Sequence, residues 1–499
     1  MESRFSLFSL HGEGERMKAY IKNAWYYCKR NGISRTFFTA MERMLLKDNK
    51  CYEWKDLPQE ELEKQRQRVF RNAITFSILV PAYETDSNFL CQMMDSLLNQ
   101  TYPHWELVIA DASKTDAVEN VVRDYTVRQQ ENRIVYKRLE NNAGISANTN
   151  EALKLATGEY IGLLDHDDVL TPDALYEMAV QIESAKKQGK AVKMLYSDED
   201  KCDMDMTHFY EPHFKEEFNL DLILSNNYIC HFLVMEAGLM KQVQFQTEFD
   251  GAQDYKLVLD AVTVLMRDTE NTLQKTGVDN NVNSTCYNNT WFEESIVHIP
   301  KVLYHWRCHT GSTAQNPQSK LYAYDAGKRA VAYFCEKHGW RNVTVEHLPH
   351  LGFYKIVYGN GQDKSNGNVT KETVAANIFA VRKDVGAVGG AVLHHGRIVG
   401  GRYRQDGYIY YQGLFHRFSG YMHRAVLMQE AETLDVRCIV VREELQATWQ
   451  EIRAKYNLPE HITEKVPEKQ FRQAGLELAE VLHKQGYRMV WNPAIKCKI

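Results

Sequence analysis

Strands and helices are expected to alternate from Phe76 onward, and this alternation constrains the fold of the chain more than any other feature. Four apolar runs have the length of buried strands, and each of the first three is followed by a helical segment. Strands that alternate with helices imply right-handed crossovers and a parallel sheet. We predict strands at 76–80, 105–110, 133–139 and 160–164, and helices at 89–99, 117–130 and 146–156.

Polar or acidic residues follow all four predicted strands. The carboxyl ends of parallel strands meet at one edge of a sheet, and ligands bind in the crevice outside that edge. We therefore expect one site there rather than four unrelated solvated turns. Its candidate residues are Pro81, Tyr83 and Glu84 after the first strand, Asp111 after the second, Asn142 and Gly144 after the third, and Asp165, Asp167 and Asp168 after the fourth.

The stretch after the fourth strand suggests a metal site. Carboxylates crowded at the end of a buried strand repel one another, and a cation is the natural compensation. Asp165 and Asp167 have the spacing to share Mg²⁺ or Mn²⁺ while a substrate phosphate completes the shell. The sequence has neither a G-x-G-x-x-G turn nor a Walker loop, so a metal would have to hold a diphosphate. A solvated acidic turn capped by Thr171 is the alternative.

Nine short motifs follow one another along the chain: SILVPAYE, ELVIADAS, ENNAGISANTNEAL, TGEYIGLLDHDD, YSDEDK, YEPHFK, NYICHFLV, FDGAQDYKLVLD and HIPKVLYHWR. Together they resemble family 2 glycosyltransferases of the GT-A fold. The likeness covers about 76–339 and points to bacterial enzymes that build O-antigen and rhamnose-rich wall chains. The resemblance implies a Rossmann-like, mixed, mostly parallel sheet.

The resemblance also implies roles for single residues. Asp111 would bind the base or ribose of a nucleotide-diphospho-sugar, with Pro81, Tyr83 and Glu84 lining the same pocket, and Asn142 and Gly144 would also contact this donor. Asp165 and Asp167 would hold the metal, and Asp165 would thereby also contact the donor. Asp254 would be the general base, and Arg307 or His305 would approach the leaving diphosphate, with His305 as a further metal ligand.

Two of these roles have plain structural alternatives. Asp254 lies near the start of a predicted helix, where a negative charge is favourable in any protein. His305, beside Trp306, is equally consistent with a core histidine.

A chain of 499 residues suggests more than one domain. We expect a helical N-terminal extension at 1–72, a glycosyltransferase domain at 73–340 and a smaller, abridged, non-catalytic α/β domain at 341–499. The extension is either a membrane-surface arm or a helical cap. The aromatic run 408–418 could bind acceptor saccharide, bind a second subunit or only pack, and 266–294 is expected to be an inserted loop.

Ten cysteines without regular spacing argue against a zinc module or a disulfide framework and favour a reducing compartment. The N-terminus lacks the apolar core of a signal peptide, and no run is long enough to span a bilayer. We therefore expect a cytoplasmic protein, peripheral at the inner face of the cell membrane if the extension is an arm. We expect no nucleic-acid partner.

The predicted activity is metal-dependent, inverting transfer of a sugar from a nucleotide-diphospho-sugar to a saccharide, such as a lipid-linked one, in bacterial surface polysaccharide synthesis. The first alternative is a non-catalytic, glycosyltransferase-like binding or assembly subunit. The second is a nucleotide-sugar hydrolase or pyrophosphorylase, which would lack the Asp254 segment and need a basic triphosphate loop. A homodimer is left open.

Overall fold

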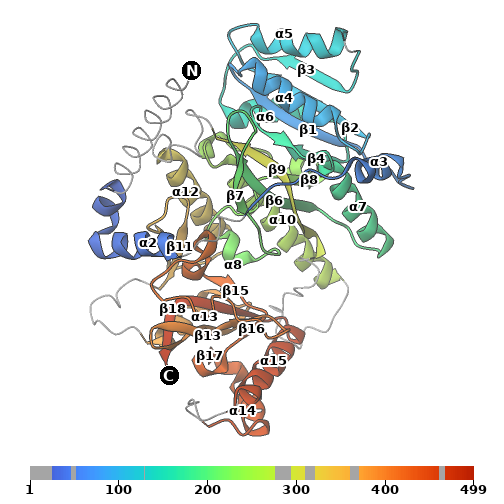
Figure 1. Cartoon of the computed structure of the whole chain (residues 1–499). Coiled ribbons are helices and arrows are strands. Elements are labelled where there is room, and N and C mark those ends of the chain that lie inside the picture. Colours follow the sequence, from blue (N-terminus) through green and yellow to red (C-terminus); the bar gives the residue numbers. More distant parts are fainter. Residues whose placement is uncertain are drawn as a thin grey trace.

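Two α/β units, each built on its own sheet, make up most of the protein (Figure 1). The computed structural model describes residues 25–45, 52–128, 130–275, 294–308, 321–359, 370–459 and 467–499. None of the helices in these ranges is both long enough and apolar enough to cross a membrane.

The first sheet has nine strands in the order β3-β2-β1-β4-β8-β6-β9-β5, with β7 paired to β6. The four strands predicted from the sequence are parallel neighbours, whereas β8 runs antiparallel to β4 and β6. The prediction of a mixed sheet with a parallel core is confirmed. The predicted elements are β1 (Phe76–Ala82), α4 (Ser87–Leu98), β2 (Trp105–Asp111), α5 (Ala117–Arg123), β3 (Ile134–Arg138), α6 (Ile145–Leu155) and β4 (Tyr160–Leu163).

Strand alternation divides the core of this unit between the two faces of the sheet. Ile78 and Val80 of β1 pack with α4, α5 and α7 on one face. Leu79 points the other way and packs with α6, α9 and α10. Because both faces are covered by helices, β1, β2 and β4 are largely apolar, and polar groups gather near their ends.

The rest of the first unit brings later segments back to the parallel core. β9 is parallel to β6, and β5 is a short strand antiparallel to β9. α10 continues to Lys275, so the loop predicted from Met266 is wrong in its first part, and 276–293 lies outside the described residues. The later elements are β5 (Val169–Leu170), α7 (Ala174–Lys187), β6 (Met194–Cys202), β7 (Phe209–His213), α8 (Leu220–Ile223), β8 (Leu233–Glu236), α9 (Ala237–Val243), α10 (Gln253–Lys275), β9 (Ile296–Arg307) and α12 (Leu321–Lys337).

The second unit is built on a five-stranded sheet, in which β12 and β18 are parallel. The hairpin of β10 and β11 precedes it and packs with the core of the first unit through Val345 and Tyr354. The elements are β10 (Val343–His347), β11 (Tyr354–Tyr358), α13 (Lys371–Val381), β12 (Val385–His394), β13 (Arg397–Gly400), β14 (Arg402–Tyr403), η4 (Tyr421–Val426), β15 (Gln429–Glu430), β16 (Thr433–Leu434), η5 (Val436–Cys438), β17 (Ile439–Val441), α14 (Gln446–Lys455), α15 (Glu468–Lys484) and β18 (Arg488–Lys498).

One disulfide, Cys438–Cys497, joins η5 to β18 across this second sheet. The two cysteines are 59 residues apart in the sequence, so their spacing carried no signal of the pairing. Of the cysteines that the structure describes, Cys202, Cys230, Cys308 and Cys335 are free and buried.

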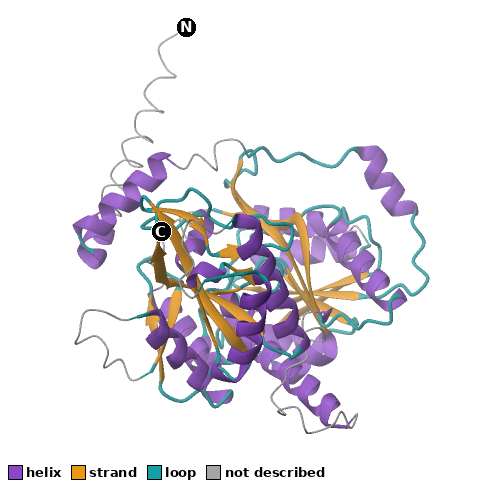
Figure 2. Cartoon of the chain, turned by 90° about the horizontal axis from the view of Figure 1, so that it is seen from below, coloured by secondary structure: helices purple, strands orange, loops and turns teal. Residues whose placement is uncertain are grey.

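The N-terminal extension divides between the two units. Helix α2 (Ile33–Leu45) packs on the second unit, where the buried Glu42 carboxylate accepts hydrogen bonds from Ser419 and Gly420. Helix α3 (Gln59–Gln67) packs on the first unit, where Gln65 accepts a hydrogen bond from Thr101. An extended segment at 52–58 leads to α3 (Figure 2). These contacts are those of a helical cap, and membrane contact through 1–72 stays a prediction.

Two stacked histidines join the β10–β11 turn to the second unit. The rings of His350 and His423 are 3.5 Å apart, and Tyr27 packs on His350. Burial, followed by the charges of His423 and nearby arginines, lowers the pKa of His350 to about 3. Burial and the charge of Arg43 lower the pKa of His423 to about 4. Both rings are therefore neutral in the folded protein at any pH above these values.

We expect the free energy of unfolding to fall as pH drops from about 7 to about 5, because both rings gain protons only in the unfolded chain. The double variant His350→Gln/His423→Gln should lose less of its melting temperature over this interval than the wild type. Replacement of the exposed His208 by Gln is the control. A double variant that follows the wild-type pH curve would contradict the prediction.

Candidate active site

The ends of β1, β2 and β3 lie side by side, as predicted. Ala82 pairs with Asp111, and Asp111 pairs with Arg138. Just beyond β1, the amide of Glu84 donates to the Ser113 hydroxyl at 2.8 Å. The Glu84 carboxylate accepts hydrogen bonds from Thr115 and from the Lys114 amide, and these hold its pKa below the usual range. Pro81 is half-buried and Tyr83 exposed in the same loop.

Asp111 is fully enclosed at this edge. Its carboxylate accepts hydrogen bonds from the Tyr136 hydroxyl and the Ser113 amide, each at 2.8 Å. An Arg138 nitrogen lies 3.6 Å from the same carboxylate, which has no exposed surface. A nucleotide could reach Asp111 only if Tyr136 or Arg138 moved.

Asn142 and Gly144 shape the turn that starts α6. The Asn142 side-chain oxygen accepts hydrogen bonds from the Gly144 amide at 3.1 Å and from the Asn148 side chain at 3.0 Å. Gly144 has a φ of +94°, and a Cβ there would collide with Asp250. The structure thus gives both residues a local role and places them at the same edge as Asp111.

Three carboxylates form an acidic cluster after β4. Ligand atoms of Asp165, Asp167 and Asp168 all lie within 4.8 Å of one another. In the ranges that the structure describes, this is the single group of three or more such ligands that could hold a metal ion. Asp165 and Asp167 are half-buried, whereas Asp168 is 1% exposed.

Strand β9 anchors the acidic cluster through Asp168. The Tyr304 hydroxyl donates to one Asp168 oxygen at 2.5 Å, and the Arg307 amide donates to the other at 2.7 Å. Burial and the charges of Asp168 and Asp165 raise the pKa of Tyr304 well above its usual range, so the phenol keeps its proton. Asp168 therefore positions the loop, which leaves Asp165 and Asp167 as the candidate ligands.

The Arg307 side chain binds backbone carbonyl oxygens in and near the acidic cluster. Its guanidinium is fully buried, and it donates to the carbonyl oxygens of Asp167 and Met204, each at 2.6 Å. It also lies over the Phe89 ring. Arg307 therefore positions the backbone of the acidic cluster, and its approach to a leaving diphosphate stays a prediction.

Electrostatics support a cation at the acidic cluster. Burial raises the pKa of Asp165, and the charges of Asp167 and Asp254 raise it further. Burial and the charges of Asp167 and Asp165 raise the pKa of Asp168 well above its usual range. The ionised cluster is thus short of positive charge, and a divalent ion bound by oxygen ligands would supply it.

The charge of Asp254 acts on this cluster, since it contributes to raising the pKa of Asp165. Asp254 is in the first turn of α10, and its carboxylate accepts a hydrogen bond from the Asn227 side chain at 2.9 Å. The half-buried carboxylate is held in one orientation while part of it stays accessible. This arrangement suits a base that removes a proton from a bound hydroxyl.

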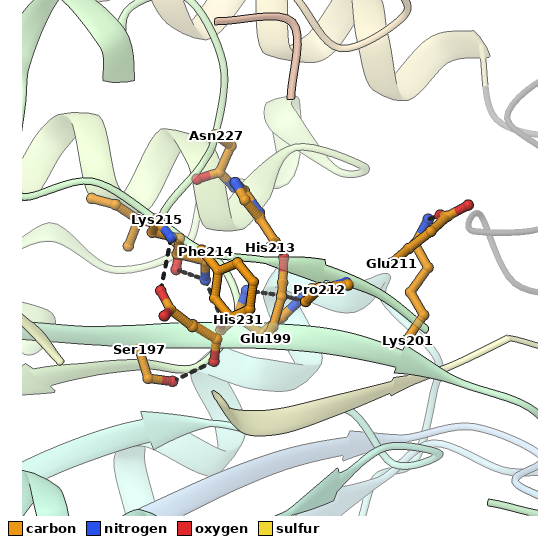
Figure 3. Close-up of polar contacts among 12 residues, drawn as sticks. Ser197, Glu199, Lys201, Glu211, Pro212, His213, Phe214, Lys215, Asn227 and His231 are labelled. Atoms are coloured by element: carbon orange, nitrogen blue, oxygen red, sulfur yellow. Dashed lines mark hydrogen bonds and ion pairs between the residues drawn. The ribbon is translucent and has the colours of Figure 1, made fainter. Parts of the chain in front are cut away.

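A second network lies behind the cluster, and its His231 was missed from the sequence, whereas Glu199, His213 and Lys215 were left there without a definite role. Glu199 of β6 contacts His213 at 3.2 Å and His231 at 3.1 Å (Figure 3). Burial alone would raise the pKa of Glu199, but Lys215 and the two histidines hold it well below the usual range. Burial alone would lower the pKa of His231, but Glu199 and the acidic cluster raise it to about 9.

His231 therefore carries a proton at neutral pH and partly offsets the charge of Asp165, whose pKa it lowers. Its ring stacks on Tyr304 with centroids 4.8 Å apart. The one signal for these residues in the sequence was their place in the motifs YSDEDK and NYICHFLV.

Comparison with known proteins assigns the first unit. The family model described as Glycosyl transferase family 2 matches residues 77–243. These residues are a glycosyltransferase family 2 domain. Together with the sheet order, this match confirms the expected GT-A class. The match ends before Asp254, Tyr304 and Arg307, so the structure alone places these three beside the family 2 domain's acidic cluster.

The family 2 domain has relatives among much longer proteins. One relative is the uncharacterized protein y4gI of Sinorhizobium fredii (strain NBRC 101917 / NGR234), which is 36% identical in the aligned part. The alignment covers 53% of this chain and 26% of that protein. The O-antigen biosynthesis protein RfbC of Myxococcus xanthus is 29% identical over 53% of this chain, which covers 18% of that protein. The solved structure of S. aureus TarS 1-349 in complex with UDP-GlcNAc is 19% identical, with a TM-score of 0.36 over 53% of this chain and 72% of that chain.

The fold of the first unit does not bring His305 to the acidic cluster. Successive residues of β9 point to opposite faces, so Tyr304 faces the cluster and His305 faces away. The His305 ring bonds to Asp200 at 2.5 Å and packs edge-on against Trp54 at 4.6 Å between centroids. The predicted role as a metal ligand is not supported by this placement, which is that of a satisfied core histidine.

Tyr304→Phe should weaken Mn²⁺ binding by the family 2 domain roughly tenfold or more, since residues that orient metal ligands matter about that much. Calorimetric titration with Mn²⁺ measures the effect. Tyr160→Phe is the matched control, because this buried tyrosine donates to the Val192 carbonyl instead. Equal affinities of the two variants would show that Asp168 needs no anchor.

Proposed function

We propose that the first unit catalyses metal-dependent, inverting transfer of a sugar from a nucleotide-diphospho-sugar to a saccharide acceptor. The observation that carries this proposal is the acidic cluster at the end of β4, accompanied by an Asp254 carboxylate that Asn227 holds by a hydrogen bond. It combines a candidate metal site with a separate candidate base. Membership of the first unit in family 2 supports the reaction class.

In this proposal Asp165 and Asp167 hold Mg²⁺ or Mn²⁺. A bound ion would neutralise the negative charge that builds up on the nucleotide diphosphate as its bond to the sugar breaks. Asp254 accepts the proton of the acceptor hydroxyl, and Asn227 keeps its carboxylate aimed. Tyr304 and Arg307 hold the loop that carries both ligands. One displacement of this kind inverts the sugar carbon and requires no protein nucleophile.

We further propose that the acceptor belongs to a growing bacterial surface polysaccharide, carried on a lipid. The names of relatives support this class of product, since RfbC of Myxococcus xanthus is an O-antigen biosynthesis protein. Cytoplasmic location and contact with the inner face of the membrane stay predictions of the same kind.

Asp165→Asn and Asp167→Asn should abolish metal-dependent binding of a nucleotide-diphospho-sugar. Calorimetry with UDP-sugars and GDP-sugars, with and without Mn²⁺, measures this. Because its ionised form is disfavoured in the fold, replacement of Asp165 by a neutral amide should leave the metal-free melting temperature unchanged or raise it. Undiminished metal-dependent binding in both variants would overturn the metal site.

Asp254→Asn should keep donor binding and lose transfer by a factor of about 10² or more, as expected for loss of a general base. Transfer is followed by nucleotide diphosphate release in the presence of acceptor. Asp268→Asn, an exposed position on the same helix, is the control. An Asp254→Asn variant with wild-type transfer would assign the base to another residue.

A further inference from the structure

A cavity of about 810 Å³ lies outside the candidate active site, between α2, the second unit and one residue of the first unit. Phe38, Met41 and Leu45 of α2 form one side, and Glu216 contributes from the first unit. The remaining wall comes from 397–424 of the second unit and contains most of the aromatic run 408–418. The size is within the range of small-molecule sites, about 300–1,000 Å³.

We propose that this cavity binds the acceptor saccharide, a proposal that rests on the glycosyltransferase function proposed above. The wall combines flat tyrosine rings with polar and charged groups. Tyrosine offers an apolar face and a hydroxyl on the same ring, which matches a sugar with an apolar C–H face and a hydroxylated edge. The residues that carry this argument are Tyr408, Tyr410, Tyr411, Gln412, Tyr421 and Glu216.

Most of these rings are held in place before any ligand arrives. The Arg402 guanidinium lies 3.9 Å from the centre of the Tyr410 ring. The Tyr411 hydroxyl donates to Gln429 at 2.9 Å, and the Tyr421 hydroxyl donates to the Pro212 carbonyl at 2.6 Å. Fixed rings lose little conformational entropy when a sugar stacks on them, which favours binding.

Charge in the wall favours a saccharide over an acyl chain. Glu216 accepts from Arg402 at 2.8 Å and lies 3.7 Å from Arg424, so ionised groups line the cavity with their charges paired. Arg397 and the exposed Gln412 add further donors. A hydrocarbon chain cannot hydrogen-bond to such groups, whereas sugar hydroxyls can.

The cavity shares a wall with the candidate active site. His213 contacts Glu199, and the Lys215 ammonium donates to the Ile229 carbonyl at 2.9 Å and to the carbonyl of His231. The next residue, Glu216, lines the cavity instead. Residues 213–216 therefore face the Glu199 network on one side and the cavity on the other, and Figure 3 shows His213, Phe214 and Lys215 beside Glu199.

The second unit braces this shared wall. The Phe214 amide donates to the Tyr421 hydroxyl at 2.9 Å, and the Arg424 guanidinium donates to the Phe214 carbonyl at 2.6 Å. A saccharide chain held on the tyrosines is thus bound next to the segment that supports His231, which in turn stacks on Tyr304 of the acidic cluster's anchor.

The probe is an array of oligosaccharides released from bacterial surface polysaccharides, followed by calorimetry with the best-bound member. Tyr408→Ala removes a ring that is 56% exposed and so leaves the fold intact. We expect this variant to bind the selected oligosaccharide at least about tenfold more weakly, which is the loss of one aromatic contact of about 1.4 kcal/mol. Tyr26→Ala, 45% exposed and outside the cavity, should bind it as the wild type does.

Donor binding separates this proposal from the proposed function. Tyr408→Ala should keep the wild-type thermal shift with UDP-sugars or GDP-sugars and Mn²⁺ and show a higher acceptor KM. Active transfer with an unchanged acceptor affinity in Tyr408→Ala would overturn the cavity as acceptor site and leave the glycosyltransferase function standing. Oligosaccharide binding that is lost in Tyr408→Ala, in a protein without transferase activity, would uphold the saccharide site and overturn the function. Displacement of a fluorescent fatty acid from the cavity, with no oligosaccharide bound, would overturn the saccharide assignment.

Discussion

The buried negative charge of the acidic cluster is the constraint on which the rest of the site depends. Three carboxylates converge where β4 ends, and burial makes the ionised forms of Asp165 and Asp168 unfavourable. The fold offsets this partly, by Tyr304 and the Arg307 backbone at Asp168 and by the protonated His231 near Asp165. None of these groups cancels the charge on the two outer aspartates. The loop of such a site is fixed in position while part of its negative charge stays uncompensated, and a divalent ion can neutralise that charge.

The strand ends could be predicted from the sequence because the information was local. An apolar run predicts a strand, alternation with helices predicts a parallel sheet, and parallel strands share an edge. Asp111, Asn142 and the acidic cluster were found in this way. The contact of Glu199 with His231 could not be found, because β8 runs antiparallel between β4 and β6 and joins the sheet out of chain order. The alternation of strands and helices along the sequence does not predict that these two residues come into contact.

Side-chain direction was the second limit of the sequence. LYHWR places Tyr304, His305 and Arg307 within four positions, and all three could have faced the ligand. The register of β5 with β9 decides, since it pairs Leu170 with Tyr304 and Val169 with His305. Tyr304 consequently turns toward the aspartates and His305 toward Asp200 and Trp54. The Arg307 side chain, at the end of β9, donates to the carbonyl oxygen of Asp167 in the loop and to that of Met204 after β6.

Paired polar groups join the two α/β units, together with apolar contacts such as that of Leu427 with the core of the first unit, and these pairs bear on how one unit could influence the other. Arg382 forms a buried ion pair with Asp221 at 2.7 Å, and Glu216 pairs with Arg402. Asn219 exchanges two hydrogen bonds with the backbone of Glu430, each at 3.0 Å. A buried charge left without its partner is strongly unfavourable, so a shift of one unit along the other that separated these pairs would cost free energy. The residues of the first unit in these pairs lie within 216–221, directly after the segment that contacts Glu199. The second unit therefore holds in place the backbone that supports His231. It can contribute to the site in this way although its described residues hold no acidic cluster like that of the first unit.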